Sequence, residues 1–190
     1  MITPRHNPFL SFVWRPEEIS PAVTAMSRRT STRAVFDCSG VRPGRCATAL
    51  LEARATDVKL SPGFFLSEDL EPFLKITGVR NVWVEIHPAA TQDGGDAFRE
   101  RLGRLSSKRD LRFIPVSGDA SFLDGTVRMK DPPAAVALKG AEASGFTGAE
   151  SAGVLYAMLR SLTRGRPDSP SLIVWGGVAT PEAAAAFLST

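Results

Sequence analysis

Polar residues at the ends of short apolar segments carry groups that can transfer protons or hold charge. They are Asp37, Lys59, His87, Asp119 and Lys139. If those segments are parallel strands joined by helices, their carboxyl ends share one rim, where such folds place catalytic residues. His87 either acts as acid or base near neutral pH or forms hydrogen bonds in a turn. Asp37 and Asp119 either contribute to this rim or cap the helices that follow.

Cys38 and Cys46 are the only cysteines, and the chain has two histidines. Cys38 acts as a nucleophile only if a neighbour lowers its pKa, and the sequence offers no such neighbour, which favours a buried thiol. So few ligands exclude a structural zinc site, and we expect no metal. Two thiols without an obvious bridge indicate a reduced, cytoplasmic setting.

Two glycine-bearing loops can bring backbone N–H groups close to a ligand. Lys139-Gly140 follows one apolar segment, and Gly176-Gly177 follows another. Thr180-Pro181-Glu182 then has the N-cap, proline and first-turn acid of a helix expected over residues 183–188. N–H groups beside a helix start suit an anion, so Gly176-Gly177 is a candidate phosphate site, or else a tight turn without a ligand.

The elements that must position these residues alternate along the chain. Strands are expected over residues 9–14, 33–36, 56–60, 82–86, 111–116, 135–138 and 172–175. Helices are expected over residues 16–29, around 46–53, 67–76 and 96–105, with a weaker helix before residue 131. Together these form about seven strand–helix units of a TIM-type α/β barrel. A complete barrel takes about 250 residues, so we interpret residues 1–190 as a single incomplete barrel domain with no eighth strand seen.

Local signals refine these boundaries. Thr147 and Glu150 have the spacing of a capping box and predict a helix closing near Gly165, with an apolar face. That face comprises Val154, Leu155, Met158, Leu159 and Leu162. Cys46, Leu50 and Ala53 share one face of an earlier helix. A Gly94-Gly95 loop is expected before the helix at 96–105, and Pro115 predicts an irregular strand because proline supplies no ladder N–H.

Two of these segments resemble a known family. Residues 138–148, LKGAEASGFTG, resemble a loop of nitronate monooxygenase-like flavoproteins, and residues 173–184, IVWGGVATPEAA, resemble that family's later phosphate strand. The version with Lys139 and Phe146 is closest to the barrel domain at the front of some polyketide and polyunsaturated fatty acid synthases.

The resemblance implies a flavin-dependent oxidoreductase that acts on an acyl chain. It implies FMN, with Lys139 against the flavin ring, where a lysine steadies the charge of a reduced flavin. The remaining cofactor-binding residues that it implies are Gly145, Gly148, Gly176 and Gly177. The implied partners are other domains or the acyl carrier protein of a synthase multienzyme.

Two residues depart from the family pattern. Phe146 stands where nitronate monooxygenases carry a catalytic histidine, and a phenyl ring cannot transfer a proton, so nitronate oxidation is not expected. Ser144 replaces the first of the paired glycines and narrows the backbone conformations available. A second hypothesis is therefore a structural or docking domain whose flavin chemistry is lost, and a third is a barrel enzyme that binds a phosphorylated metabolite. No residue is assigned a catalytic role.

Composition narrows the partners further. The net charge of +3 comes from mixed acids and bases, and we expect no nucleic-acid binding. No segment approaches the ~18 apolar residues of a membrane span, and no signal peptide is apparent. A barrel without its eighth strand has two apolar edges, at residues 9–13 and 172–175. We therefore expect a longer polypeptide, a strand-completing partner or an oligomer.

Overall fold

The computed structural model describes residues 11–29, 33–106, 110–143 and 149–176. The strands are β1 Ser11–Trp14, β2 Arg33–Asp37, β3 Asp57–Leu60, β4 Asn81–Glu85, β5 Arg112–Ser117, β6 Ala135–Leu138 and β7 Ser171–Val174. The helices are η1 Pro16–Glu18, α1 Pro21–Arg29, α2 Pro43–Glu52, α3 Pro62–Leu66, α4 Leu70–Thr77, α5 Pro88–Ser106, α6 Ala120–Val127 and α7 Ala152–Thr163, η1 being a 3₁₀ helix. The chain forms two compact units, Met1–Val82 and Trp83–Thr190.

The first unit is built on parallel strands that pair in chain order. β2 lies between β1 and β3, with Phe36 opposite Val58 in the register. The N–H groups of Arg80 and Asn81 both donate to the Thr56 carbonyl, at 3.0 and 2.9 Å, and lead into β4. Cys46 and Leu50 of α2 are buried, as is Ala53 just beyond it, which confirms the predicted face.

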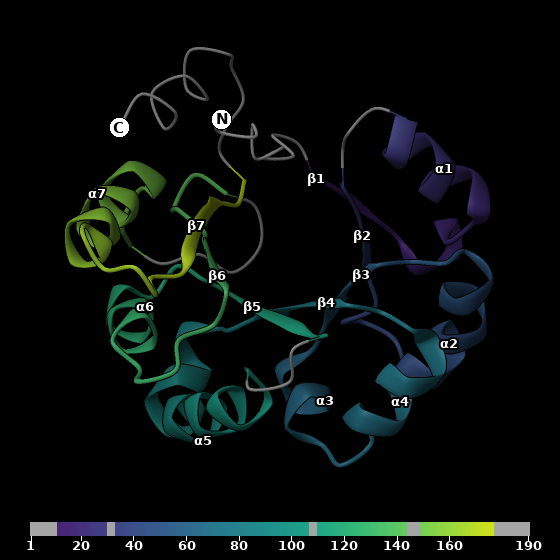
Figure 1. The fold of residues 1–190 in the computed structure, drawn as a ribbon, viewed down its shortest axis with the longest axis horizontal. Coiled ribbons are helices and arrows are strands. Elements are labelled where there is room, and N and C mark those ends of the chain that lie inside the picture. The colour runs from purple at the N-terminus through teal and green to yellow at the C-terminus, as the bar shows by residue number, and fades with distance from the viewer. Residues whose placement is uncertain (1–10, 30–32, 107–109, 144–148, 177–190) are drawn as a thin grey trace. The chain divides into compact units, whose positions relative to one another are not determined.

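The second unit repeats this arrangement with β5, β6 and β7. Leu138 of β6 lies opposite Ser117 of β5 on one side and Val174 of β7 on the other. Figure 1 shows α6 and α7 beside these strands. The residues that form the helix-facing core are Leu123, Val127, Val136, Leu138, Leu155 and Leu159. Because strand side chains alternate, the other residues of β6 face away from these helices.

The predicted strands are confirmed within one or two residues wherever the structure describes them. The pairs β1–β2, β2–β3, β5–β6 and β6–β7 are parallel, and the strand order follows the chain order. This is the arrangement of a TIM-type barrel, with seven of the eight strands present in the described part of the chain. The fold class predicted from the sequence is therefore confirmed.

Two predicted helices of the first unit have different boundaries. The helix expected over residues 16–29 is divided into η1 and α1, because the residue before Pro21 is disfavoured in a helical conformation. The helix expected from residue 67 begins at Leu70, and a short helix, α3, precedes it. Ser61 caps α3 by accepting a hydrogen bond from the Phe64 N–H at 3.3 Å. The third strand is therefore followed directly by a helix start.

The expectation for the start of α5 was wrong. α5 runs from Pro88 through the glycine pair at 94–95, where a loop was predicted. Each helical glycine costs about 1 kcal/mol, and the burial of Phe98, Leu102 and Leu105 outweighs that cost. β5 includes Pro115, and the carbonyls of Val116 and Ser117 beyond it accept hydrogen bonds from the N–H groups of Ile86 and Lys139. The irregularity expected at Pro115 stays a prediction.

The predicted face of α7 needs one correction. Val154 is 52% exposed, whereas the buried residues of this helix are Ala152, Leu155, Leu159 and Thr163. Met158 and Leu162 are partly buried against the core. The core-facing stripe is therefore centred on Leu155 and Leu159, and Val154 lies outside it.

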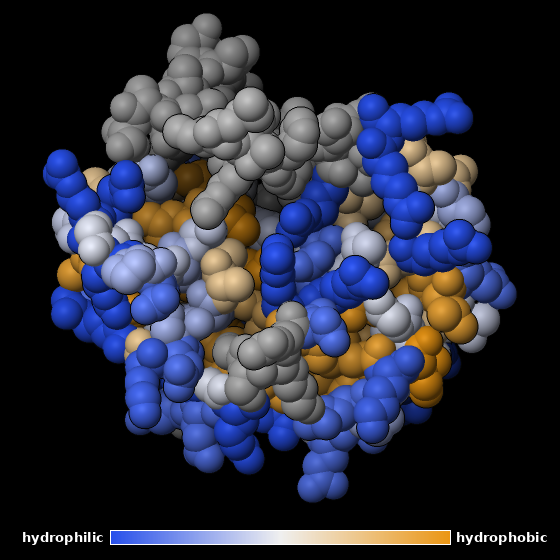
Figure 2. Space-filling model, viewed as in Figure 1, coloured by the Kyte–Doolittle hydropathy of each residue, from blue (hydrophilic) through white to orange (hydrophobic). Residues whose placement is uncertain are grey.

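Some apolar side chains are exposed on the helices of the first unit. Leu51 of α2 and Ile76 of α4 are 52% and 58% exposed. Figure 2 shows apolar residues at the surface over α2 and α4. Within the described residues, no helix combines the length and hydrophobicity that a membrane span requires.

Candidate functional site

A buried ion pair lies at the strand ends of the second unit. Lys139 follows β6 directly, and its Nζ donates to Oε1 of Glu85, the last residue of β4. The side chains of Lys139 and Glu85 are only 5% and 15% exposed. A salt bridge to Glu142 is the alternative that the sequence offers for Lys139, but Glu142 instead accepts a hydrogen bond from the Ala152 N–H. The actual partner is 54 positions away in the sequence.

The register of β6 and β7 places Trp175 beside Lys139. Leu138 lies opposite Val174, and the Trp175 N–H donates to the Leu138 carbonyl at 2.8 Å. The next residues on both strands, Lys139 and Trp175, therefore occupy neighbouring positions on the face that looks away from α6 and α7. We call this the inner face of the unit.

Two tryptophan rings meet near the ion pair. The ring centroids of Trp83, in β4, and Trp175 are 5.0 Å apart, with the planes tilted by 47°. Trp83 is 1% exposed and precedes Glu85 by two residues, the spacing that keeps two strand side chains on one face. We define Glu85, Lys139, Trp83 and Trp175 as the rim cluster. It combines a buried charge pair with two aromatic rings.

β5 lies between the strands that supply the ion pair. The Lys139 N–H donates to the Ser117 carbonyl, and the Ile86 N–H donates to the Val116 carbonyl, both at 2.8 Å. The register therefore puts Gly118 level with Lys139.

The other predicted candidates of this unit have separate positions. Asp119 accepts a hydrogen bond from the Phe122 N–H at 2.8 Å, so it is the N-cap of α6, one of the two roles predicted for it. His87 follows β4 and is partly buried, two residues after Glu85. This spacing puts His87 on the same side of the strand as the rim cluster.

The loop after β6 is shaped by Glu142. Its Oε1 accepts a hydrogen bond from the N–H of Ala152, the first residue of α7, at 2.9 Å. A Cβ on Gly140 would lie 2.5 Å from Glu142 Oε2 and would also clash with the Ala152 nitrogen. Gly140 is therefore required by this contact. The carboxylate occupies the positive end of α7.

The start of α7 also differs from the predicted one. Ser151 is the N-cap, and its hydroxyl accepts from the Val154 N–H at 3.3 Å. Glu150 lies outside the helix, and Thr147, the other half of the predicted capping box, lies outside the described residues. Ser151 and Glu142 together accept hydrogen bonds from two N–H groups in the first turn of α7, those of Val154 and Ala152.

The loop after β7 packs closely against the loop after β6. Gly176 has a φ of +73°, and a Cβ there would lie 2.8 Å from the Ala143 Cβ. Both its conformation and its close packing therefore require glycine. The other predicted cofactor-binding residues, Gly145, Gly148 and Gly177, lie outside the described residues, as do Ser144 and Phe146.

The first unit has an ion pair of its own at its strand ends. Lys59 Nζ lies 2.9 Å from Asp37 Oδ2, and their side chains are 12% and 27% exposed. Ser39 also donates to Asp37 Oδ1 from its N–H and its hydroxyl, at 3.0 and 2.5 Å. Partial burial raises the pKa of Asp37, but the hydrogen bonds from Ser39 and Lys59 and the Lys59 charge outweigh it and lower the pKa overall. Asp37 is thus an ion-pair partner and not the predicted helix cap.

Cys38 follows Asp37 and is completely buried, and Cys46 is 4% exposed. Both thiols are free. Burial raises the pKa of the Cys38 thiol, and the neighbouring Cys46 and Asp37 raise it further. This confirms the buried thiol and opposes a nucleophilic role.

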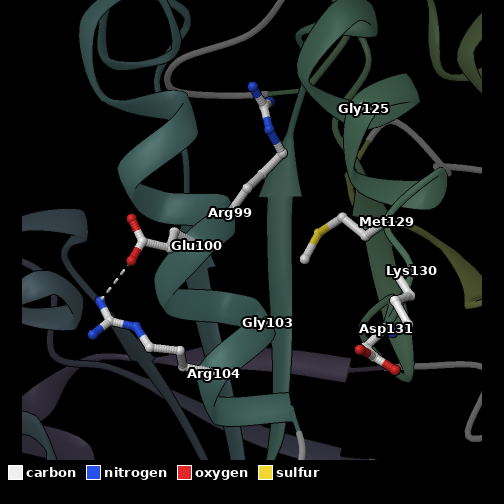
Figure 3. Close-up of a pocket in the computed structure, with 8 residues that line it drawn as sticks. All are labelled: Arg99, Glu100, Gly103, Arg104, Gly125, Met129, Lys130 and Asp131. Atoms are coloured by element: carbon white, nitrogen blue, oxygen red, sulfur yellow. Dashed lines mark ion pairs between the residues drawn. The ribbon is translucent and has the colours of Figure 1, made fainter.

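Two surface grooves of the second unit lie outside the rim cluster. One, of about 440 Å³, lies between α5 and the segment around the end of α6; it is lined by Arg99, Glu100, Gly103, Arg104, Gly125, Met129, Lys130 and Asp131. Figure 3 shows Met129 pointing toward α5 in this groove. The other, of about 300 Å³, involves the start of β7 and the end of α7. Neither groove contains a predicted site residue. Among the described residues, no group of three or more histidine, cysteine or acidic side chains could hold a metal ion.

Comparisons with known proteins establish the fold. No protein-family model matches the sequence. No curated protein matches it. Among solved structures, FabK from Thermotoga maritima matches with a TM-score of 0.65 and 18% identity over 90% of this chain and 51% of FabK. Its M276A mutant matches with a TM-score of 0.61 and 20% identity, over 89% of this chain and 54% of the mutant. This chain thus spans about half the length of FabK.

Orotidine 5'-phosphate decarboxylase from Pyrococcus horikoshii OT3 is also similar in structure. It matches with a TM-score of 0.58 and 13% identity over 96% of this chain and 86% of the decarboxylase. Identities this low carry no information on activity. The matches support the TIM-type barrel fold that the strand order indicates.

Proposed function

We propose that this chain is a nitronate monooxygenase-like, FMN-type barrel domain of a polyketide or fatty-acid synthase multienzyme. Its reaction class is flavin-dependent oxidation or reduction of an acyl-chain substrate. The observation that carries the proposal is the rim cluster, because a buried lysine lies at a strand end, where barrels place their chemistry, on the same face as two tryptophans. The motifs at residues 138–148 and 173–184 support it.

The flavin-ring end of this site fits the residues present. Lys139 can offset negative charge on a reduced ring, and Trp83 and Trp175 supply an apolar surface that excludes water. Bound FMN would supply hydride or electron transfer. His87, near Glu85 in sequence, is the nearest predicted residue that can exchange a proton with a substrate.

Few backbone positions are available to bind the FMN phosphate. The first N–H of α7 already bonds to Glu142, so that helix start is not free to take a phosphate. Gly176-Gly177 is then the phosphate site that the sequence motif leaves, together with Gly145 and Gly148 of the other motif.

An FMN titration tests the proposal directly. We expect the purified chain to turn yellow and to quench flavin fluorescence, and Gly177→Val to weaken binding at least tenfold while keeping the fold. Gly63→Val is the matched control, because a Cβ on Gly63 meets nothing within 4 Å. Equal affinity for both variants would place the phosphate elsewhere. A colourless wild-type chain that takes up no FMN would refute the flavin proposal.

The substrate class has its own test. With FMN bound, we expect no turnover of propyl nitronate above the rate of free flavin, because Phe146 cannot transfer a proton. Acyl thioesters should instead change the rate at which bound flavin is oxidised or reduced. Nitronate turnover well above the free-flavin rate would show that another residue replaces the missing histidine.

A structural or docking domain is the second candidate, and two observations favour it. The close packing of Gly140 on Glu142 and of Gly176 on Ala143 explains both glycines without a ligand. Leu51 and Ile76 are exposed apolar side chains that a partner domain or acyl carrier protein could cover. Under this hypothesis the chain stays colourless, and Leu51→Lys with Ile76→Lys weakens its association with such a partner in light scattering. Val154→Lys, another exposed apolar position, is the control.

A further inference from the structure

We propose that Glu85 is a positioning residue that sets how much of the Lys139 charge a bound flavin can use. The inference rests on the proposed function and assigns a role to a residue that the sequence motif does not contain. Glu85 holds the Lys139 ammonium in an ion pair within the rim cluster. Any negative charge that develops on a cofactor at this cluster therefore competes with the Glu85 carboxylate for the same cation.

Burial makes this competition strong. Lys139 and Glu85 are 5% and 15% exposed, and charge interactions at a given distance are stronger there than in bulk water. Trp83 and Trp175 pack together on the same face and limit the water near the pair. Glu85 therefore reduces the positive charge that Lys139 presents to any group that approaches it from the inner face.

Stability alone does not explain why this ion pair is present. Replacing a buried ion pair by apolar residues of similar volume is often neutral or stabilising. Lys139 reaches Glu85 across β5, so the pair links the ends of two strands that are not neighbours in the sheet. A pair with these requirements is better explained by control of a charge than by folding.

The test compares the affinities of oxidised and reduced FMN for the wild type, Glu85→Gln, Lys139→Met and the double variant. Removing the negative charge should favour reduced FMN in Glu85→Gln by about tenfold relative to oxidised FMN, a rise of about 30 mV for a two-electron couple. Lys139→Met should shift the same ratio in the opposite direction. In the double variant the Glu85→Gln effect should disappear, because the charge that it releases is absent.

Two further variants keep the test decisive if Glu85→Gln folds poorly. Glu85→Asp and Lys139→Arg retain both charges and should keep the ratio within about threefold of the wild type. Circular dichroism reports whether each variant is folded. If FMN binds and the two neutralising variants shift the ratio in the same direction, or not at all, this inference is wrong and the flavin proposal stands. If no variant and no wild-type protein binds FMN, the proposed function itself fails and this inference with it.

Discussion

The two compact units each carry a lysine–carboxylate pair at their strand ends, and the pairs differ in construction. Lys59 and Asp37 lie directly opposite each other in the register of β3 and β2, and Ser39 adds two further hydrogen bonds to Asp37. Lys139 and Glu85 instead come from β6 and β4, with β5 between them. The first pair joins neighbouring strands, whereas the second reaches across one.

The two ion pairs also differ in how deeply they are buried. The Asp37 side chain is 27% exposed and has several hydrogen-bond donors. Water and Ser39 therefore stabilise its negative charge in addition to Lys59. Glu85 and Lys139 are more deeply buried and adjoin two tryptophans. The comparison shows that position at a strand end does not by itself distinguish a site. The deeper burial of the pair and its reach across a strand distinguish the two sites. Both features favour Lys139 over Lys59 as the functional lysine.

The largest expected effect comes from breaking the buried pair. Lys139→Met leaves the Glu85 carboxylate buried without its cation and should destabilise the second unit by about 3 kcal/mol. Lys139→Met combined with Glu85→Leu should recover most of that loss, because neither charge remains. Urea unfolding followed by tryptophan fluorescence measures both values. A single-variant loss below about 1 kcal/mol would mean that water reaches the pair.

The loops after β6 and β2 offer a second comparison, through one glycine in each. Gly140→Ala should cost about 2 kcal/mol, because its Cβ would clash with Glu142 and the start of α7. Gly40→Ala should be close to neutral, since a Cβ there meets nothing within 4 Å. Thermal unfolding of the two variants gives the difference. Equal melting temperatures would show that the Glu142 contact relaxes without cost.

Breaking the pair of the first unit should cost less. Lys59→Met should destabilise by about 1 kcal/mol, because Asp37 keeps both hydrogen bonds from Ser39 and is partly solvated. Lys59→Arg preserves the charge and is the matched control. Urea unfolding measures the loss of stability in Lys59→Met and in Lys139→Met, so that the two values can be compared. A loss as large as that of Lys139→Met would remove the distinction drawn between the pairs.

The smallest expected effect is a pH dependence of stability at Asp37. Because its pKa is lower in the folded chain than the unfolded value of about 3.9, the folded state favours the carboxylate. This contribution is present above about pH 4 and is lost as the pH falls through the folded pKa. Asp37→Asn should therefore flatten the acid side of the stability curve by less than about 1 kcal/mol. Urea midpoints below pH 5 measure it, and an unchanged acid limb would refute the assignment.

Much of the fold follows from local signals in the sequence. Apolar runs of four to six residues ended by polar residues or glycine located the strands, because strand burial and turn chemistry act over neighbouring residues. The helix starts were less predictable. Ser151 caps α7 with help from Glu142, and Glu142 is nine positions earlier, beyond the reach of a capping pattern. α5 passes through glycines that local propensity assigns to a loop.

The candidate site divides in the same way between sequence and tertiary structure. The sequence by itself determined that Lys139 ends a buried strand beside Gly140, and that Trp175 ends another beside Gly176. Only the tertiary structure decided that Lys139 pairs with Glu85 and not with Glu142, which is three residues away. The reason is strand direction and spacing: Glu142 follows the chain out of the strand toward α7, while parallel pairing aligns the carboxyl ends of β4 and β6. A partner 54 residues distant is set by that alignment, and no pattern within a short stretch of sequence encodes it.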